Sequence, residues 1–263
     1  MKAKIIFILL AQLSLISCSQ EVKTKEEIIK KYVTNGAKKF NYKFQMQEWQ
    51  QCLDEGLKID STVAYLWQQK AMPYFKARKY EIGMQYIDKA VQYDSESWQP
   101  YRAFIKCVFA KRYKDAIVDF EDCKKRFGNN YVMDHTYNFY IALSYLQLNE
   151  FKKAEKLLQG YVDDLFNELG EEWLHPTALF YLGISKYEQN KYKAAIIEFD
   201  RALKLYPELS EANYYKSICL MKTKQKENAK LAFQKFKFDS EKGYSINEDN
   251  AIYEVYPYQV KSK

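Results

Sequence analysis

The sequence is poor in the residues that make tight turns. Its 263 residues include only eight Gly and five Pro, too few for a fold built from many short strands joined by tight turns. Hydrophobic residues nevertheless make up 48% of the chain and aromatic residues 17%, which is ample material for a core. The composition therefore disfavours a β-rich protein without excluding a well-packed one.

Residue types that carry catalysis or bind metals are also scarce. There are two His and five Cys, and no spacing among them matches a zinc site. No glycine-rich loop that cradles a phosphate is present, and the acid pairs at 163–164 and 171–172 are typical of solvated faces. We expect no metal, no cofactor and no enzymatic activity, with His135 and His175 exposed or capping helices.

The cysteines lie in or beside positions expected to pack between helices. The default prediction for Cys52, Cys107, Cys123 and Cys219 is a buried free thiol. A disulfide between Cys107 and Cys123 is the alternative in an oxidising compartment, and the sequence does not set the distance between them.

Charge of one sign is not strongly in excess. The formal net charge is +7, and without residues 1–17, which carry two lysines and no acid, 39 basic and 34 acidic side chains are left. This excess is too small and too scattered for nucleic acid.

The first 17 residues have the pattern of an export signal. Lys2 and Lys4 precede an apolar run from Ile5 to Ile16, which is too short to span a bilayer as a mature helix. The segment Leu15-Ile16-Ser17-Cys18 resembles a bacterial lipobox, which implies cleavage before Cys18 and lipidation of that cysteine. The alternative is ordinary secretion with cleavage after Ser19. Ser19 beside the lipidated cysteine favours the outer membrane.

Residues 176–209 contain a pattern of small and aromatic residues typical of a helical hairpin. Ala195, Phe199 and Ala202 share one helical face, and Pro207 ends the second helix. With Leu182-Gly183 and Tyr192 they resemble the tetratricopeptide repeat (TPR), a 34-residue helix–turn–helix unit. The resemblance implies an all-α fold, an α-solenoid in which about six hairpins form a right-handed superhelix.

The pattern recurs along the chain at intervals of about 34 residues. The units we predict are 30–63, 64–96, 97–130, 135–168, 176–209 and 210–243, preceded by a tether at 18–29 and followed by a tail at 244–263. Phe104, Trp49 and Tyr161 replace small residues of the pattern, and 131–134 and 169–175 are inserted loops. The positions that define the repeat are Ala71, Tyr80, Gly83, Ala90, Ala116, Ala142, Ala154, Gly183, Tyr192, Ala195, Ala202 and Pro207.

Equivalent positions on the first helices form an apolar stripe, which in this family commonly faces the concave groove. Its residues are Tyr101, Phe139, Phe180, Tyr214, Ile105, Leu143, Ile184 and Ile218. We expect these side chains to bind a partner, because aromatic residues dominate interface hot spots. The alternative is that the stripe only seals neighbouring first helices together. The tail is either a loose or capping end, or a segment that folds back into the groove.

The leading functional hypothesis is a lipid-anchored scaffold of the cell envelope that binds a partner protein or peptide through its concave groove. Its attachment to the membrane is through the lipid, and no nucleic acid is expected. The alternative is an envelope lipoprotein that binds a solute or glycan, because 24 Tyr offer stacking surfaces for sugar rings. An enzyme is a third class, and no group of residues supports it.

Overall fold

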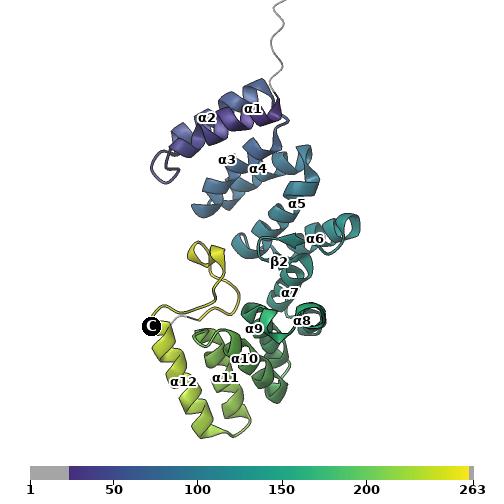
Figure 1. Cartoon of the computed structure of the whole chain (residues 1–263), viewed down its shortest axis with the longest axis vertical. Helices are drawn as coiled ribbons and strands as arrows, with labels where there is room; N and C mark the ends of the chain where they lie inside the picture. Colours follow the sequence, from purple (N-terminus) through teal and green to yellow (C-terminus); the bar gives the residue numbers. More distant parts are fainter. Residues whose placement is uncertain (1–23, 261–263) are drawn as a thin grey trace, which may run out of the picture.

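The computed structural model describes residues 24–260, in which six helix pairs stack in sequence order into a curved column (Figure 1). Helices adjacent in sequence pack against each other along the whole column. The expected leader and Cys18 lie outside the described residues. Within residues 24–260, no helix is both long and apolar enough to cross a membrane.

The first pair begins earlier than the repeat pattern indicated. It consists of α1 (Lys25–Ile29), continued by the π-helix η1 (Lys30–Thr34), and of α2 (Met46–Ile59), with the 3-10 turn η2 (Ala37–Lys39) between them. A capping box starts α1, since Thr24 Oγ1 accepts the Glu27 N–H and the Glu27 carboxylate accepts the Thr24 N–H. Part of the expected tether is therefore helical.

Five further pairs complete the column. They are α3 (Ala64–Lys76) with α4 (Tyr80–Tyr93), α5 (Ser95–Phe104) with α6 (Tyr113–Phe127), α7 (Tyr137–Gln147) with α8 (Phe151–Leu169), α9 (Pro176–Glu188) with α10 (Tyr192–Leu205), and α11 (Ser210–Lys222) with α12 (Lys226–Glu241). The π-helix η3 (Ile105–Phe109) continues α5. Pro176 occupies the first turn of α9, where its missing N–H costs no hydrogen bond.

Small residues of the repeat lie where two helices approach closely. A Cβ atom added to Gly183 would lie 2.5 Å from Cε1 of Phe199 on the partner helix. Gly83 faces the ring of Phe75 in the same way. The alanines of the pattern are all fully buried: Ala71, Ala90, Ala116, Ala142, Ala154, Ala195 and Ala202.

The bulky replacements are accommodated in the core. Phe104 is 1% exposed, with the rings of Phe109 and Tyr140 at its edge, and it directly precedes the π-helix η3. A π-helical turn widens the helix locally, which makes room for the ring. Trp49 is also buried, and its Nε1 donates a hydrogen bond to the Gln69 carbonyl at 3.0 Å.

The turn inside each of the last five pairs contains one left-handed residue that is not glycine. Their φ values lie between 55° and 63°. Such a residue reverses the chain directly after a helix and satisfies its last carbonyls. The residues are Arg78, Lys111, Asn149, Asn190 and Lys224.

The two inserted loops have structure of their own. In the first, β1 (Tyr131–Val132) pairs antiparallel with β2 (His135–Thr136), so this loop is a small β-hairpin. In the second, the 3-10 helix η4 (Glu171–Trp173) precedes α9, and Arg201 holds Glu171 through two hydrogen bonds of 2.9 Å. Both loops are therefore anchored to the column.

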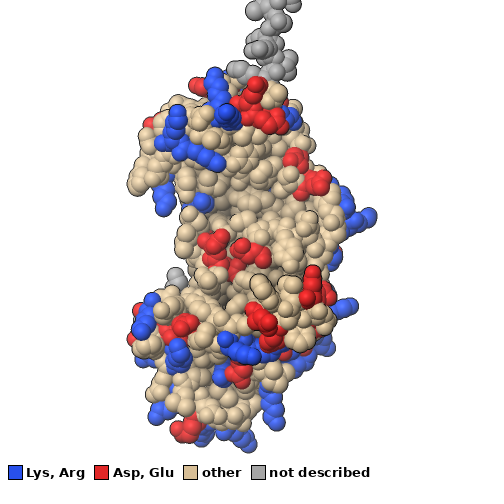
Figure 2. Space-filling view, in the orientation of Figure 1, with Lys and Arg blue, Asp and Glu red and all other residues tan. Residues whose placement is uncertain are grey.

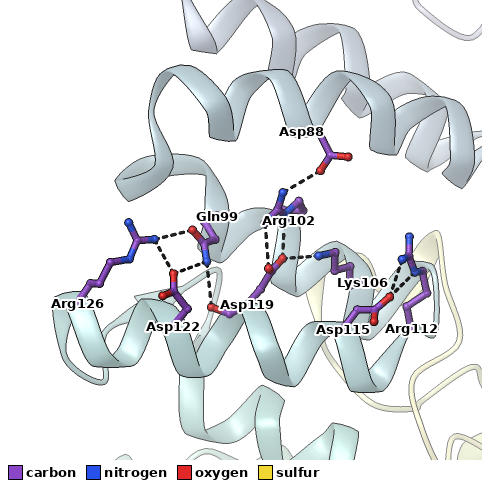
Figure 3. A network of polar contacts seen from close by, with 9 residues as sticks. All are labelled: Asp88, Gln99, Arg102, Lys106, Arg112, Asp115, Asp119, Asp122 and Arg126. Atoms are coloured by element: carbon purple, nitrogen blue, oxygen red, sulfur yellow. Dashed lines mark hydrogen bonds and ion pairs between the residues drawn. The ribbon is translucent and has the colours of Figure 1, made fainter.

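Ion pairs join the helices of the third pair to each other and to α4 (Figure 3). Arg102 on α5 makes two hydrogen bonds to Asp119 on α6, at 2.8 and 2.9 Å, and one to Asp88 on α4 at 2.8 Å. Lys106 adds a 2.6 Å contact to the same Asp119 carboxylate. Because the buried Asp119 is paired with two cations, its desolvation is compensated, and the three helices are held in register.

Candidate functional site: a concave face covered by the C-terminal segment

The predicted groove stripe is largely inaccessible, so we correct that prediction. Side chains at five of its eight positions are at most 1% exposed: Phe139, Phe180, Ile105, Leu143 and Ile184. Phe180 packs between helices, with its ring centroid 6.0 Å from those of Phe199 on α10 and Tyr215 on α11. The three remaining residues, Tyr101, Tyr214 and Ile218, are partly exposed. The alternative hypothesis, that the stripe seals neighbouring helices, describes Phe180 correctly.

The chain's own C-terminal segment, defined here as residues 244–260, covers the inner side of the curve. After α12 it turns back and runs toward the α3–α4 turn, drawn in yellow in Figure 1. It contains one short 3-10 helix, η5 (Asp249–Ile252). Ile246 and Tyr256 are 3% and 2% exposed and belong to the main hydrophobic core. The tail is therefore docked, as in the second hypothesis for it.

Side chains from three different helix pairs bind the backbone of this segment. Arg78 in the α3–α4 turn donates to the Tyr253 carbonyl at 3.2 Å, and Lys111 in the η3–α6 turn donates to the Val255 carbonyl at 2.6 Å. The Tyr181 hydroxyl on α9 donates to the Pro257 carbonyl at 2.9 Å.

The three donors are spaced along the column, and each binds a main-chain carbonyl, a group that every peptide has. The segment is irregular rather than an extended strand here, because Tyr253 has αR backbone angles and Tyr258 has a φ of 60°.

Further contacts fix the side chains of the segment. Glu254 accepts a hydrogen bond from the Tyr80 hydroxyl and pairs with Arg78 at 3.2 Å. The Tyr258 ring packs edge-on against Tyr215 at 5.8 Å. The C-terminal segment is therefore held both by its main-chain carbonyls and by its side chains.

Charge is unevenly distributed over the molecule. In the view of Figure 2, Asp and Glu side chains gather around the hollow at mid-height, whereas Lys and Arg side chains lie at the two ends and along the opposite edge. Asp134 lies near the carboxylates of Glu248 and Asp249. Burial and these two acidic neighbours raise the pKa of Asp134. The inner face therefore favours cationic groups.

The structure corrects or specifies the remaining sequence predictions for single residues. His135 is 0% exposed rather than at the surface, and His175 caps α9, because its Nδ1 accepts the Thr177 N–H at 3.3 Å. The four cysteines within residues 24–260 are free thiols. Burial raises the pKa of Cys107 and of Cys123 to about 11, so both are protonated at neutral pH.

Sequence analysis did not single out Arg78, Lys111 or Tyr181 as binding residues. Arg78 and Lys111 occupy the left-handed turn position described above, where cations stand in place of the usual Gly or Asn. Lys224 occupies the same position without binding the segment, so the residue type alone does not identify the binding residues. Tyr181 carries no local signal, because its role depends on a segment far away in sequence.

Glu211 is a buried carboxylic acid beneath the segment. Its side chain is fully buried and accepts a 2.5 Å hydrogen bond from Ser245, and Tyr181, Tyr206 and Tyr215 are the titratable groups near it. Burial raises the pKa of Glu211. A raised folded-state pKa means that Glu211 costs no stability while protonated and costs stability once pH rises through that pKa.

The substitution Glu211→Gln keeps a hydrogen-bond acceptor and removes the ionisation. We expect the melting temperature of the variant relative to the original to rise as pH increases from about 4 to about 8. Thermal unfolding across this range measures the difference, and Glu227→Gln, at an exposed position of α12, is the matched control. A difference that stays constant with pH would contradict the assignment.

Comparison with known proteins agrees with the architecture. Residues 176–209 match the family model described as tetratricopeptide repeat. Similar solved structures are PilF from Pseudomonas aeruginosa (TM-score 0.59, 13% identity, covering 82% of this chain and 100% of that one) and MamA from Desulfovibrio magneticus RS-1 (TM-score 0.57, 14% identity, 68% and 96%). The chain folds as a TPR solenoid.

A third similar structure is YrrB, described as a TPR protein with an unusual peptide-binding site (TM-score 0.53, 18% identity, 71% and 91%). At these identities the likeness concerns the fold alone. No curated protein matches this TPR solenoid by sequence.

Proposed function

We propose that this TPR solenoid is a scaffold, without enzymatic activity, that binds an extended segment of a partner protein along its concave face. The observation that supports this most is the mode in which residues 244–260 are held. Arg78, Lys111 and Tyr181 bind carbonyls of every second residue in the segment. These are the carbonyls of Tyr253, Val255 and Pro257. Carbonyl oxygens are common to every peptide, so the same donors suit the main chain of an incoming segment.

We further propose that the scaffold is attached to the cell envelope through lipid on Cys18, in the outer membrane. The support for this is the basic start, the short apolar run and the lipobox-like segment 15–18 of the sequence. Such an anchor would place the first helix pair, α1 and α2, nearest the membrane. The concave face would lie next to this pair.

The proposal predicts that a peptide with the sequence of residues 244–260 binds in trans when the chain's own copy is weakened. Ile246→Ala together with Tyr256→Ala removes the two buried anchors of the segment without altering the face it covers. We expect a fluorescently labelled peptide to bind this double variant at least about tenfold more tightly than the original chain, whose own segment competes. Fluorescence anisotropy measures both affinities.

Two controls make the result specific. Adding Lys111→Met to the double variant removes the donor to the Val255 carbonyl and should weaken the peptide by about tenfold. A scrambled peptide keeps the carbonyls but loses the side-chain anchors. Equal binding of the peptide to the original chain and the double variant, or none to either, would contradict a peptide-binding concave face.

A further inference from the structure

Three side chains from separate parts of the chain meet under the C-terminal segment. His135 lies in β2 directly after the first inserted loop, His175 ends the second, and Glu248 belongs to the segment itself. Each offers one ligand atom, and these atoms lie within 4.8 Å of one another. Nε2 of His135 lies 3.1 Å from Oε1 of Glu248, and Nδ1 of His175 lies 4.0 Å from the same oxygen.

Two of the three side chains are removed from water. The side chains of His135 and Glu248 are 0% and 1% exposed, and that of His175 is 34% exposed. A carboxylate buried to this degree is costly unless a positive charge compensates it. A cation bound between the two imidazoles and Glu248 would supply that charge.

The neighbours of the two histidines orient their rings. Nδ1 of His135 lies 3.2 Å from the Tyr161 hydroxyl, which leaves Nε2 facing Glu248. The Phe139 ring stacks on His135 with centroids 3.7 Å apart, and the two imidazole centroids are 4.4 Å apart. A hydrogen bond to the second ring nitrogen is the usual partner of a metal-bound histidine, because it fixes the ring and its tautomer.

The donor set suits a metal of the zinc type. Zinc accepts two imidazoles, which are borderline ligands, together with one carboxylate, a hard ligand. Tetrahedral bonds of about 2.1 Å place ligand atoms about 3.4 Å apart. His135 and Glu248 are already near this separation. His175 would close the site with a shift of about 1 Å. Binding through Nδ1 would replace the hydrogen bond that this atom accepts from the Thr177 N–H at the start of α9.

The repeat architecture does not require these residues. Both histidines lie at the ends of the inserted loops that interrupt the repeat spacing, and Arg201 fixes the second loop through Glu171. The carboxylates of Asp134 and Asp249 add negative charge near Glu248, which attracts a cation. The two inserted loops, the C-terminal segment and the negative charge therefore meet at His135, His175 and Glu248.

We propose that His135, His175 and Glu248 form a binding site for a divalent transition-metal ion of the zinc type, which ties the C-terminal segment to the two inserted loops. The proposal concerns this chain's own residues and does not depend on what the concave face binds.

The test is metal titration of the full-length protein carrying Cys18→Ser and Cys52→Ser, which removes a thiol outside the described residues and the one partly exposed thiol within them. After removal of bound metal with a chelator, we expect Zn²⁺ to bind at one ion per chain with a Kd below about 10 µM. A hundredfold excess over Kd should raise the melting temperature by about 5 °C. Co²⁺ should give the visible absorption of a four-coordinate ion.

The variants Glu248→Gln and His175→Ala should each weaken Zn²⁺ at least about tenfold, with unchanged circular dichroism. The matched control is Asp249→Asn, which removes the adjacent carboxylate and should change the affinity less than about threefold. Zn²⁺ binding weaker than about 1 mM, or binding that survives both ligand variants, overturns the proposal. Equal binding of Mg²⁺ and Zn²⁺ also overturns it, because a zinc-type site discriminates against Mg²⁺.

Discussion

Replacing Phe180 with alanine will lower the free energy of unfolding by about 3–5 kcal/mol. Phe180 is fully buried, and its ring contacts Tyr181, Phe199 and Tyr215. Removing the ring leaves a cavity among three helices, α9, α10 and α11, that are already packed. The cost is therefore both the lost transfer free energy of the ring and the cavity that remains.

Denaturant unfolding followed by circular dichroism measures this loss. Phe166→Ala on α8 is the matched control, because the Phe166 side chain is 49% exposed, and it should change the unfolding free energy by less than about 0.5 kcal/mol. The apolar stripe of the sequence predicts instead that Phe180 acts in partner binding. If Phe180→Ala were as stable as the control, the side chain would belong to an accessible groove after all.

Replacing Gly183 with alanine will destabilise the fifth helix pair, by about 1–3 kcal/mol. The added Cβ would lie 2.5 Å from Cε1 and 2.7 Å from Cδ1 of Phe199. Phe199 is itself fully buried, and its ring packs against those of Phe180 and Tyr215. Relief of the clash therefore requires α9 and α10 to separate.

Gly160→Ala is the control for helix propensity. Gly160 lies inside α8, and an added Cβ meets no atom within 4 Å there, so alanine should stabilise the protein by about 0.5–1 kcal/mol. The two glycine variants should therefore shift the thermal unfolding midpoint in opposite directions. Stabilisation by both would mean that the helices of the fifth pair are not in close contact at Gly183.

Local patterns in the sequence are sufficient to predict the solenoid fold. Gly183 and Phe199 contact each other within one hairpin, so their spacing along the chain directly reports the packing. The same holds for Gly83 and Phe75. These contacts are short in sequence separation, and repetition of the motif reinforces each of them.

The site depends on contacts that no local pattern contains. His135 and Glu248 are 113 residues apart, and neither lies at a position that the repeat defines. The docking of residues 244–260 also could not be read from their composition, because extended segments bury side chains only where another surface receives them. The stripe was misassigned for the same reason: whether Phe139 faces solvent depends on the loop and segment that cover it.

The capping box at Thr24 is a case between these extremes. Its residues, Thr24 and Glu27, are three apart and carry a recognisable helix-start pattern. A helix start could therefore have been placed at Lys25 from the sequence. The repeat spacing instead predicts that the first unit begins at residue 30. The first helix is longer than the usual unit allows, because the π-helix η1 (Lys30–Thr34) continues it.

The C-terminal segment follows α12 after a short connection. It therefore competes with any ligand that binds the concave face. A segment tethered this closely acts as a competitor at an effective concentration in the millimolar range, and diluting the protein does not lower it. In the function proposed above, an incoming chain would have to exceed this competition before it could bind Arg78, Lys111 or Tyr181. Weak encounters would then be rejected, and only a sequence with better anchors than Ile246 and Tyr256 would displace the segment.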